Sequence, residues 1–470
     1  MRLLVFALAI ALPQLVISQT NPGAPSSAPP LETGKVLAHI PCAAHPEQSY
    51  ALFLPSNYSR DRRWPIVYSF DPAARGTVPV ALQKRAAERY GYILAASNNS
   101  KNGSWKIERE AADAIFRDTH ERLPLDDHAV YFAGFSGGAR VAAQIALLCK
   151  CATGVLLSGA GFPTNATPAR DASFPVFSSV GMLDFNYQEV VPLQEKLQQA
   201  GYPHWLYIFD GAHEWAPEEA MEQAFAWFRL QAMKAKRLAP EQTFLAAQFS
   251  QAVTQANSTE RSGDLLSAWR EYLQMIDTFD GLEDVTPLRA KADYLGKEKS
   301  VREAAKQEIK DFEEQLRLTS EVLVGPGAPA DAPDSSPDSG KSAAERARAL
   351  RLRAEQEKRA DRARVYKRAL AGAFVGAMET GANHLENHHY AHATDAFSCA
   401  TEAMPDSEWA WRNLAIADGQ EGNRKQTIAA LKHARDVAKD KAAWTEWMST
   451  EPAFERFRAT PEFQSLRNLK

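Results

Sequence analysis

Short apolar runs and amphipathic stretches alternate along the first half of the chain. The later runs are each followed by a segment of helical period, at 108–123, 139–148, 189–201 and 218–236. Strands that alternate with helices of this length predict a mostly parallel sheet with helices on both faces. The first two runs are joined by a short turn, so we expect them to form an antiparallel edge. The runs that predict strands are 35–40, 49–55, 65–70, 92–97, 129–135, 154–160, 174–181 and 204–211.

The pattern changes near residue 239, where the strand signal stops and helical periodicity continues to Lys470. One segment, 324–340, interrupts it, and its Pro, Ala, Asp and Ser content predicts a linker. The fold class is therefore α/β, followed by an all-α region. The predicted divisions are an α/β domain at 35–236, a helical region at 240–322, a linker at 323–342 and a second helical region at 343–470.

The last helical region contains two stretches that share a 34-residue template of small and aromatic residues. The two units, about 374–407 and 408–441, resemble tetratricopeptide repeats, in which small residues let two helices approach closely. Such repeats stack on one another and often present a groove to a partner. Two interpretations stay open here: the groove binds a protein partner, or the helices only pack on the first domain. The template positions are Gly381, Tyr390, Ala393, Phe397, Ala400 and Pro405, then Trp411, Leu414, Ala415, Gly422, Leu431 and Ala434.

The N-terminus begins with one Arg, an apolar stretch, and then small residues near Ser18. This order is typical of a secretory signal peptide, and the apolar stretch is too short for a membrane span. We expect a signal peptide at 1–18, a disordered linker at 19–34, and a secreted or periplasmic protein that meets a membrane only during export. The formal net charge of −4 gives no reason to expect a nucleic acid partner.

Four cysteines, Cys42, Cys149, Cys151 and Cys399, are spread without the spacing of a zinc site. An exported protein permits disulfides, so Cys42 could bridge to Cys149 or Cys151. Buried free thiols are the alternative, and the sequence leaves both open. Three histidines spaced four apart within 384–392 lack the adjacent carboxylate of a zinc-protease helix. We expect neither a metal nor a cofactor.

The segment 134–138 reads Gly-Phe-Ser-Gly-Gly and fits the pattern G-x-S-x-G. It lies between a predicted strand and a predicted helix, which is the context that gives this pattern meaning. A sharp turn there projects the hydroxyl of Ser136 at the carboxyl end of the sheet, and side chains at Gly134 or Gly138 would clash. The sequence therefore predicts that Ser136 is a nucleophile.

Serine needs a base, and an acid and then a histidine should follow later strands in that order. Asp184 comes just after the predicted strand 174–181, and His213 comes just after 204–211. Each alone is more often a helix cap or a surface residue. The three together, in the required order, predict a Ser136–His213–Asp184 triad.

The motifs "GFSGG", "VGMLD" and "GAHEW" make residues 35–236 similar to α/β-hydrolases, especially secreted esterases such as polyhydroxybutyrate-depolymerase-like, feruloyl-esterase-like and dienelactone-hydrolase-like enzymes. The resemblance implies an oxyanion site. One backbone donor would be Gly137, and Ala73 is expected as the second, because the usual His-Gly is replaced by "SFDPAARG" and Pro72 has no N–H. The aromatic residues expected to line the substrate pocket are Phe135, Phe162, Phe185 and Trp215.

The function that the resemblance implies is ester hydrolysis through an acyl-enzyme, on an ester that is polymeric or aromatic. The helical repeats would dock a substrate or a protein partner. Two other functions stay open: a weakly catalytic scaffold whose repeats bind a protein, which the altered oxyanion loop favours, and a serine peptidase of the same fold.

Overall fold

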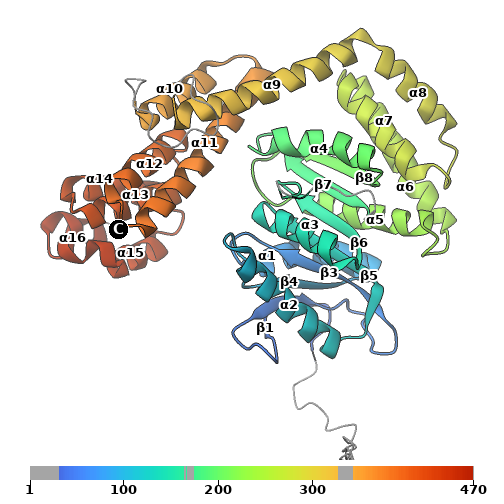
Figure 1. The fold of residues 1–470 in the computed structure, drawn as a ribbon, viewed down its shortest axis with the longest axis horizontal. Coiled ribbons are helices and arrows are strands. Elements are labelled where there is room, and N and C mark those ends of the chain that lie inside the picture. The colour runs from blue at the N-terminus through green and yellow to red at the C-terminus, as the bar shows by residue number, and fades with distance from the viewer. Residues whose placement is uncertain (1–30, 164–165, 167–173, 326–341, 469–470) are drawn as a thin grey trace, which may run out of the picture. The chain divides into compact units, whose positions relative to one another are not determined.

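A single eight-stranded sheet forms the N-terminal part of the protein in the computed structural model (Figure 1), which describes residues 31–163, 166, 174–325 and 342–468. The strand order is β1-β2-β4-β3-β5-β6-β7-β8; β2 is antiparallel to its neighbours and β3 to β8 are parallel. This mixed sheet, with a helical region after it, confirms the predicted fold class. The strands are β1 (Val36–Pro41), β2 (Ser49–Phe53), β3 (Trp64–Phe70), β4 (Ile93–Ser97), β5 (Leu125–Phe135), β6 (Ala152–Ser158), β7 (Val176–Gly181) and β8 (His204–Phe209).

Helices cover both faces of this sheet, as expected for buried parallel strands with apolar residues on each side. Residues of α1 and α5 share one core with β5 and β7. On the opposite face, Phe116 of α2 packs on Tyr68 and Phe132, and α4 packs on Val180. The helices between the strands are α1 (Thr77–Tyr90), α2 (Trp105–Arg122), α3 (Gly137–Cys149), α4 (Tyr187–Ala200) and α5 (Glu218–Lys234).

The chain after the sheet is helical, as the change of pattern near residue 239 predicts. None of the helices within the described ranges is long and apolar enough to cross a membrane. The helices are α6 (Gln242–Arg261), α7 (Leu265–Phe279), α8 (Thr286–Lys297), α9 (Lys299–Leu323), α10 (Ala343–Gln356), α11 (Ala360–Glu386), α12 (Tyr390–Ala403), α13 (Glu408–Glu421), α14 (Arg424–Val437), α15 (Lys441–Thr450), the short 3-10 helix η1 (Pro452–Phe457) and α16 (Pro461–Asn468).

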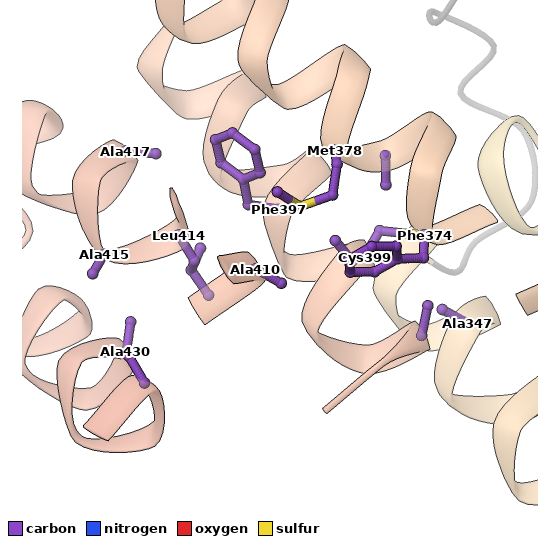
Figure 2. Packing of buried hydrophobic residues seen from close by; sticks show 14 of the residues in the cluster. Ala347, Phe374, Met378, Phe397, Cys399, Ala410, Leu414, Ala415, Ala417 and Ala430 are labelled. Atoms are coloured by element: carbon purple, nitrogen blue, oxygen red, sulfur yellow. The ribbon is translucent and has the colours of Figure 1, made fainter. Parts of the chain in front are cut away.

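The two stretches with the shared template coincide with two helix pairs, α11–α12 and α13–α14. A side chain at Gly381 would put its Cβ only 2.5 Å from the ring of Phe397, so a small residue is required where α11 meets α12. Figure 2 shows part of the core formed here, with Phe374 and Met378 of α11 near Phe397 and Cys399 of α12. The assignment to tetratricopeptide repeats stays a prediction.

Helices α9 and α11 are bonded to the segment that follows β7. The amide of Gln315 donates to the carbonyl of Phe185 (2.7 Å), and Nη1 of Arg368 donates to the carbonyl of Met182 (3.3 Å). The Arg368 guanidinium also lies 4.4 Å from the ring centroid of Tyr187, and both Gln315 and Arg368 are buried. The helical region is thus joined to the sheet by polar contacts, and residues 33–470 form one compact unit.

Of the two alternatives that the sequence leaves open for Cys42, the structure has the buried free thiol, because Cys149 and Cys151 are bonded to each other. Cys42 follows β1 at the carboxyl edge of the sheet, whereas Cys151 precedes β6 at the opposite edge. Four strands lie between β1 and β6, a separation of roughly 24 Å at the usual strand spacing. A bridge between these positions is geometrically impossible. The predicted signal peptide at 1–18, most of the linker at 19–34 and most of the linker at 323–342 lie outside the described residues.

Candidate active site

Ser136 occupies the turn between β5 and α3. Its backbone has φ 53° and ψ −122°, a conformation that L residues rarely adopt. The turn is tight on both sides: a Cβ at Gly134 would lie 2.0 Å from the carbonyl oxygen of Gly138, and one at Gly138 would lie 2.1 Å from that of Phe70. Only glycine fits at these two positions, so the G-x-S-x-G pattern has a direct steric cause.

The serine hydroxyl begins a chain of hydrogen bonds. Ser136 Oγ lies 2.8 Å from His213 Nε2, and His213 Nδ1 lies 2.9 Å from Asp184 Oδ1. With the Nδ1–H tautomer, the imidazole donates to the carboxylate and accepts from the hydroxyl. Asp184 and His213 follow β7 and β8, which lie on the same side of β5 in the sheet, so their loops meet at its carboxyl edge. The structure brings together the three side chains of the predicted triad.

The carboxylate of Asp184 is held in place by its own surroundings. It is fully buried, and its Oδ1 also accepts the N–H of Asn186 (2.8 Å). The side chain of Asn186 in turn donates to the carbonyl of Gly159 (2.7 Å), which ties the acid loop to the end of β6. These bonds fix the direction from which the carboxylate meets the imidazole.

Two phenyl rings flank the imidazole. The ring centroids of Phe135 and Phe185 lie 4.6 Å and 4.3 Å from that of His213. Apolar rings on the imidazole keep water away from it, and a polar interaction gains strength when water is excluded. The arrangement is suited to moving a proton between the serine and the histidine.

The loop that follows β3 differs from its prediction. Ala73 was expected to supply the second oxyanion donor, but its N–H donates to Asp71 Oδ1 (2.9 Å) and is not available to a substrate. Asp71 is fully buried and also accepts from Arg75 Nε and Nη2 and from Trp215 Nε1. Burial alone would raise the pKa of the Asp71 carboxyl, but hydrogen bonds from Arg75, Trp215 and the Ala73 N–H lower it below its ordinary value.

A cavity of about 970 Å³ opens in front of Ser136 and His213. Of the four aromatic residues expected in its wall, Phe135 and Phe185 line it. Phe162 instead packs on Tyr202, and Trp215 donates a hydrogen bond to Asp71, so neither lines the cavity and the prediction for these two residues is wrong. Both side chains are buried and belong to the core. The lining also includes residues that the sequence did not point to: Asn102, Trp105, Val375, Met378, Glu379 and Trp409.

No family model matches the chain, and no curated protein matches it in sequence. Similar solved structures include an esterase from Pyrobaculum calidifontis, with 14% identity and a TM-score of 0.35 over 43% of this chain and 86% of that one. An S-formylglutathione hydrolase from Staphylococcus aureus has 14% identity and a TM-score of 0.33 over 38% of this chain and 90% of that one. A ferulic acid esterase has 16% identity and a TM-score of 0.35 over 41% and 97%. These similarities are too low to indicate a function for this chain.

Proposed function

We propose that the protein is a serine hydrolase that cleaves carboxylic esters through an acyl-enzyme. The observation that carries the proposal is the hydrogen-bonded chain from Asp184 through His213 to Ser136, with the serine on a strained turn at the carboxyl edge of the sheet. A serine hydroxyl hydrogen-bonded to a histidine that a buried carboxylate orients is the arrangement that activates serine as a nucleophile.

The reaction follows from the positions of these groups. Ser136 Oγ attacks the ester carbonyl carbon while His213 Nε2 takes the hydroxyl proton, and Asp184 stabilises the resulting imidazolium. The tetrahedral intermediate collapses, its C–O bond to the alcohol breaks, and His213 returns the proton to the departing alcohol. Water then attacks the acyl-enzyme, His213 takes its proton, and the acid leaves as Ser136 Oγ regains a proton.

The backbone N–H of Gly137 is the first oxyanion donor in this proposal, because it directly follows the nucleophile at the start of α3. The cavity has room for an ester with a bulky or polymeric part, which suits the expected substrate class. The helical region contributes to this cavity, which supports substrate docking as its role.

Export is proposed from the apolar pattern at 1–18, and sequencing the N-terminus of protein recovered from outside the cytoplasm would test it.

The experiment is hydrolysis of 4-nitrophenyl acetate by the full-length protein. Wild type should turn the ester over, and Ser136→Ala should lose at least about 10³-fold in kcat while keeping the same thermal unfolding midpoint. Ser250→Ala, an exposed serine on α6, is the matched control and should behave as wild type. Equal turnover by Ser136→Ala and wild type would contradict the proposal. Comparison with the corresponding anilide separates an esterase from a peptidase.

A further inference from the structure

The proposed reaction needs a second oxyanion donor, and the loop after β3 does not supply it. Pro72 has no N–H. The N–H groups of Ala73 and Arg75 point at Asp71 Oδ1 (2.9 and 3.4 Å), and that of Ala74 donates to the Asp71 carbonyl (3.1 Å). Every backbone donor in 72–75 is therefore engaged within the loop, and a second donor must come from another element.

The loop between β4 and α2 lies directly beside this segment. The N–H of Asn102 donates to the carbonyl of Pro72 (2.9 Å), and Lys101 forms an antiparallel bridge with Ala73. These two backbone contacts hold Asn102 at the mouth of the cavity that also contains Ser136 and Gly137. In the part of the chain that the structure describes, no other residue is hydrogen-bonded to the Asn102 side-chain amide.

The side-chain amide of Asn102 lies directly against Gly137. Its Oδ1 lies 1.9 Å, and its Nδ2 3.5 Å, from the point where a Cβ on Gly137 would stand. The amide thus fills the space that a side chain at 137 would take, next to the N–H that follows the nucleophile. Rotation about the last side-chain bond exchanges Oδ1 and Nδ2, so the amide can turn an N–H toward the same point.

We propose that Asn102 is the second oxyanion donor: its Nδ2–H and the Gly137 N–H together stabilise the charge that develops on the ester carbonyl oxygen. This inference rests on the proposed ester hydrolysis. It explains why a loop with Pro72 at its start can serve a hydrolase, since the donor comes from the side chain of the neighbouring loop. It also explains why residue 137 is glycine, because any larger residue would displace the amide.

The test measures kcat and KM for 4-nitrophenyl acetate with Asn102→Ala and Asn102→Asp, after circular dichroism has shown both to be folded. Both variants should lose about 10²–10³-fold in kcat with KM within a few-fold of wild type, as expected for a contact made in the transition state. Lys101→Ala, the exposed neighbour in the same loop, is the matched control and should keep wild-type kcat.

A double-mutant cycle sharpens the result. Gly137→Ala keeps its backbone N–H but pushes the Asn102 amide aside, so it should lose activity in the wild-type background and little more in Asn102→Ala. An Asn102→Ala enzyme whose kcat stays within about three-fold of the Lys101→Ala control would overturn the inference. An inactive wild type would instead overturn the proposed function, so the two failures are distinguishable.

Two helices of the helical region, α11 and α13, form the outer wall of the cavity. Val375 and Met378 of α11 and Trp409 of α13 line the same space as Ser136 and His213. The indole of Trp409 is 59% exposed although it is large and apolar, and it packs edge-on against Phe374 of the helical core. An exposed indole that faces a catalytic serine is placed to cover an apolar group of a bound molecule.

The other rim of the cavity carries a second exposed indole, that of Trp105 at the start of α2 (38% exposed). The wall formed by α11 and α13 is fixed relative to the loop that carries Asp184. Arg368 of α11 and Gln315 of α9 both donate hydrogen bonds to backbone carbonyls of that loop. We infer that α11 and α13 bind the bulky apolar acyl group of the ester, so the helical region selects the substrate. This inference also depends on the proposed ester hydrolysis.

The test compares 4-nitrophenyl acetate with 4-nitrophenyl cinnamate, which differ only in the acyl group. Trp409→Ala should lower kcat/KM for the cinnamate about ten-fold and for the acetate less than about two-fold, because only the larger acyl group reaches the wall. Tyr294→Ala is the matched control, since Tyr294 is equally exposed (59%) on α8. An unchanged preference in Trp409→Ala, in an enzyme active on both esters, would overturn this inference and leave the proposed function standing.

Discussion

The buried carboxylate of Asp71 offers a strong test of how the loop after β3 is held. Asp71 is 0% exposed and accepts from the Ala73 N–H, from Arg75 and from Trp215. Asp71→Asn keeps the shape of the side chain but replaces one oxygen by an NH₂ group. The perturbation therefore removes a charge and an acceptor without creating a cavity.

The loss in the free energy of unfolding depends on which donor loses its acceptor. If the NH₂ replaces Oδ2, it faces Trp215 Nε1, whose bond is 2.8 Å long and whose indole is 7% exposed. If it replaces Oδ1, it faces the Ala73 N–H. Either way one donor in a largely buried site is left without an acceptor, at about 1–3 kcal/mol. The pair with Arg75 adds about 1 kcal/mol at most, because that guanidinium is 52% exposed. We expect a loss of about 1–4 kcal/mol in the free energy of unfolding.

Urea unfolding followed by tryptophan fluorescence and circular dichroism measures this loss. The control is Asp113→Asn, whose carboxylate is 63% exposed and lies 3.8 Å from Arg109, and it should cost less than about 0.5 kcal/mol. Because the pKa of Asp71 is lowered in the folded protein, the difference from wild type should be complete above about pH 4 and shrink as the pH falls below it. Equal unfolding midpoints for the Asp71 and Asp113 variants would show that the buried carboxylate of Asp71 does not stabilise the fold.

Three further changes test other parts of the account. Burial raises the pKa of Asp418 to about 6, so its ionised form destabilises the fold above that pH. In thermal melts, Asp418→Asn should therefore stabilise the helical region by about 1–3 kcal/mol at pH 7.5 and not at pH 4. Gly138→Ala would put a Cβ 2.1 Å from the carbonyl oxygen of Phe70, and we expect loss of ester turnover together with a lower unfolding midpoint. Gln315→Ala leaves the carbonyl of Phe185 without its amide donor, and it should lower kcat several-fold with little change in KM.

Periodicity was sufficient to predict the sheet, because buried parallel strands are short apolar runs and the helices between them are amphipathic. The expected antiparallel edge is present at β1 and β2. The order of Ser136, Asp184 and His213 predicted which side chains would meet, since loops after neighbouring parallel strands lie at one edge. These inferences depend on local pattern and on chain order, both of which a sequence contains.

The rest depends on contacts between segments far apart in the chain. The hydrogen bond from the Ala73 N–H to Asp71 forms because one short loop folds back on a buried carboxylate. No pattern in "SFDPAARG" indicates this bond. The approach of Asn102 to Gly137 requires the loop after β4 to lie on the loop after β3. The contribution of α11 and α13 to the cavity requires the helical region to dock near β7. A polar residue after β4 is the signal in the sequence that points to Asn102, because that strand also ends at the carboxyl edge of the sheet.

Reaction with a fluorophosphonate probe shows whether Ser136 is an activated nucleophile, since such a probe bonds covalently to an activated serine. The full-length protein is incubated with the probe, digested, and analysed by mass spectrometry to locate the modified residue. We expect one modification, on Ser136, that is absent in Ser136→Ala and strongly slowed in His213→Ala. A folded wild-type protein that does not react, or that reacts at another residue, would contradict it.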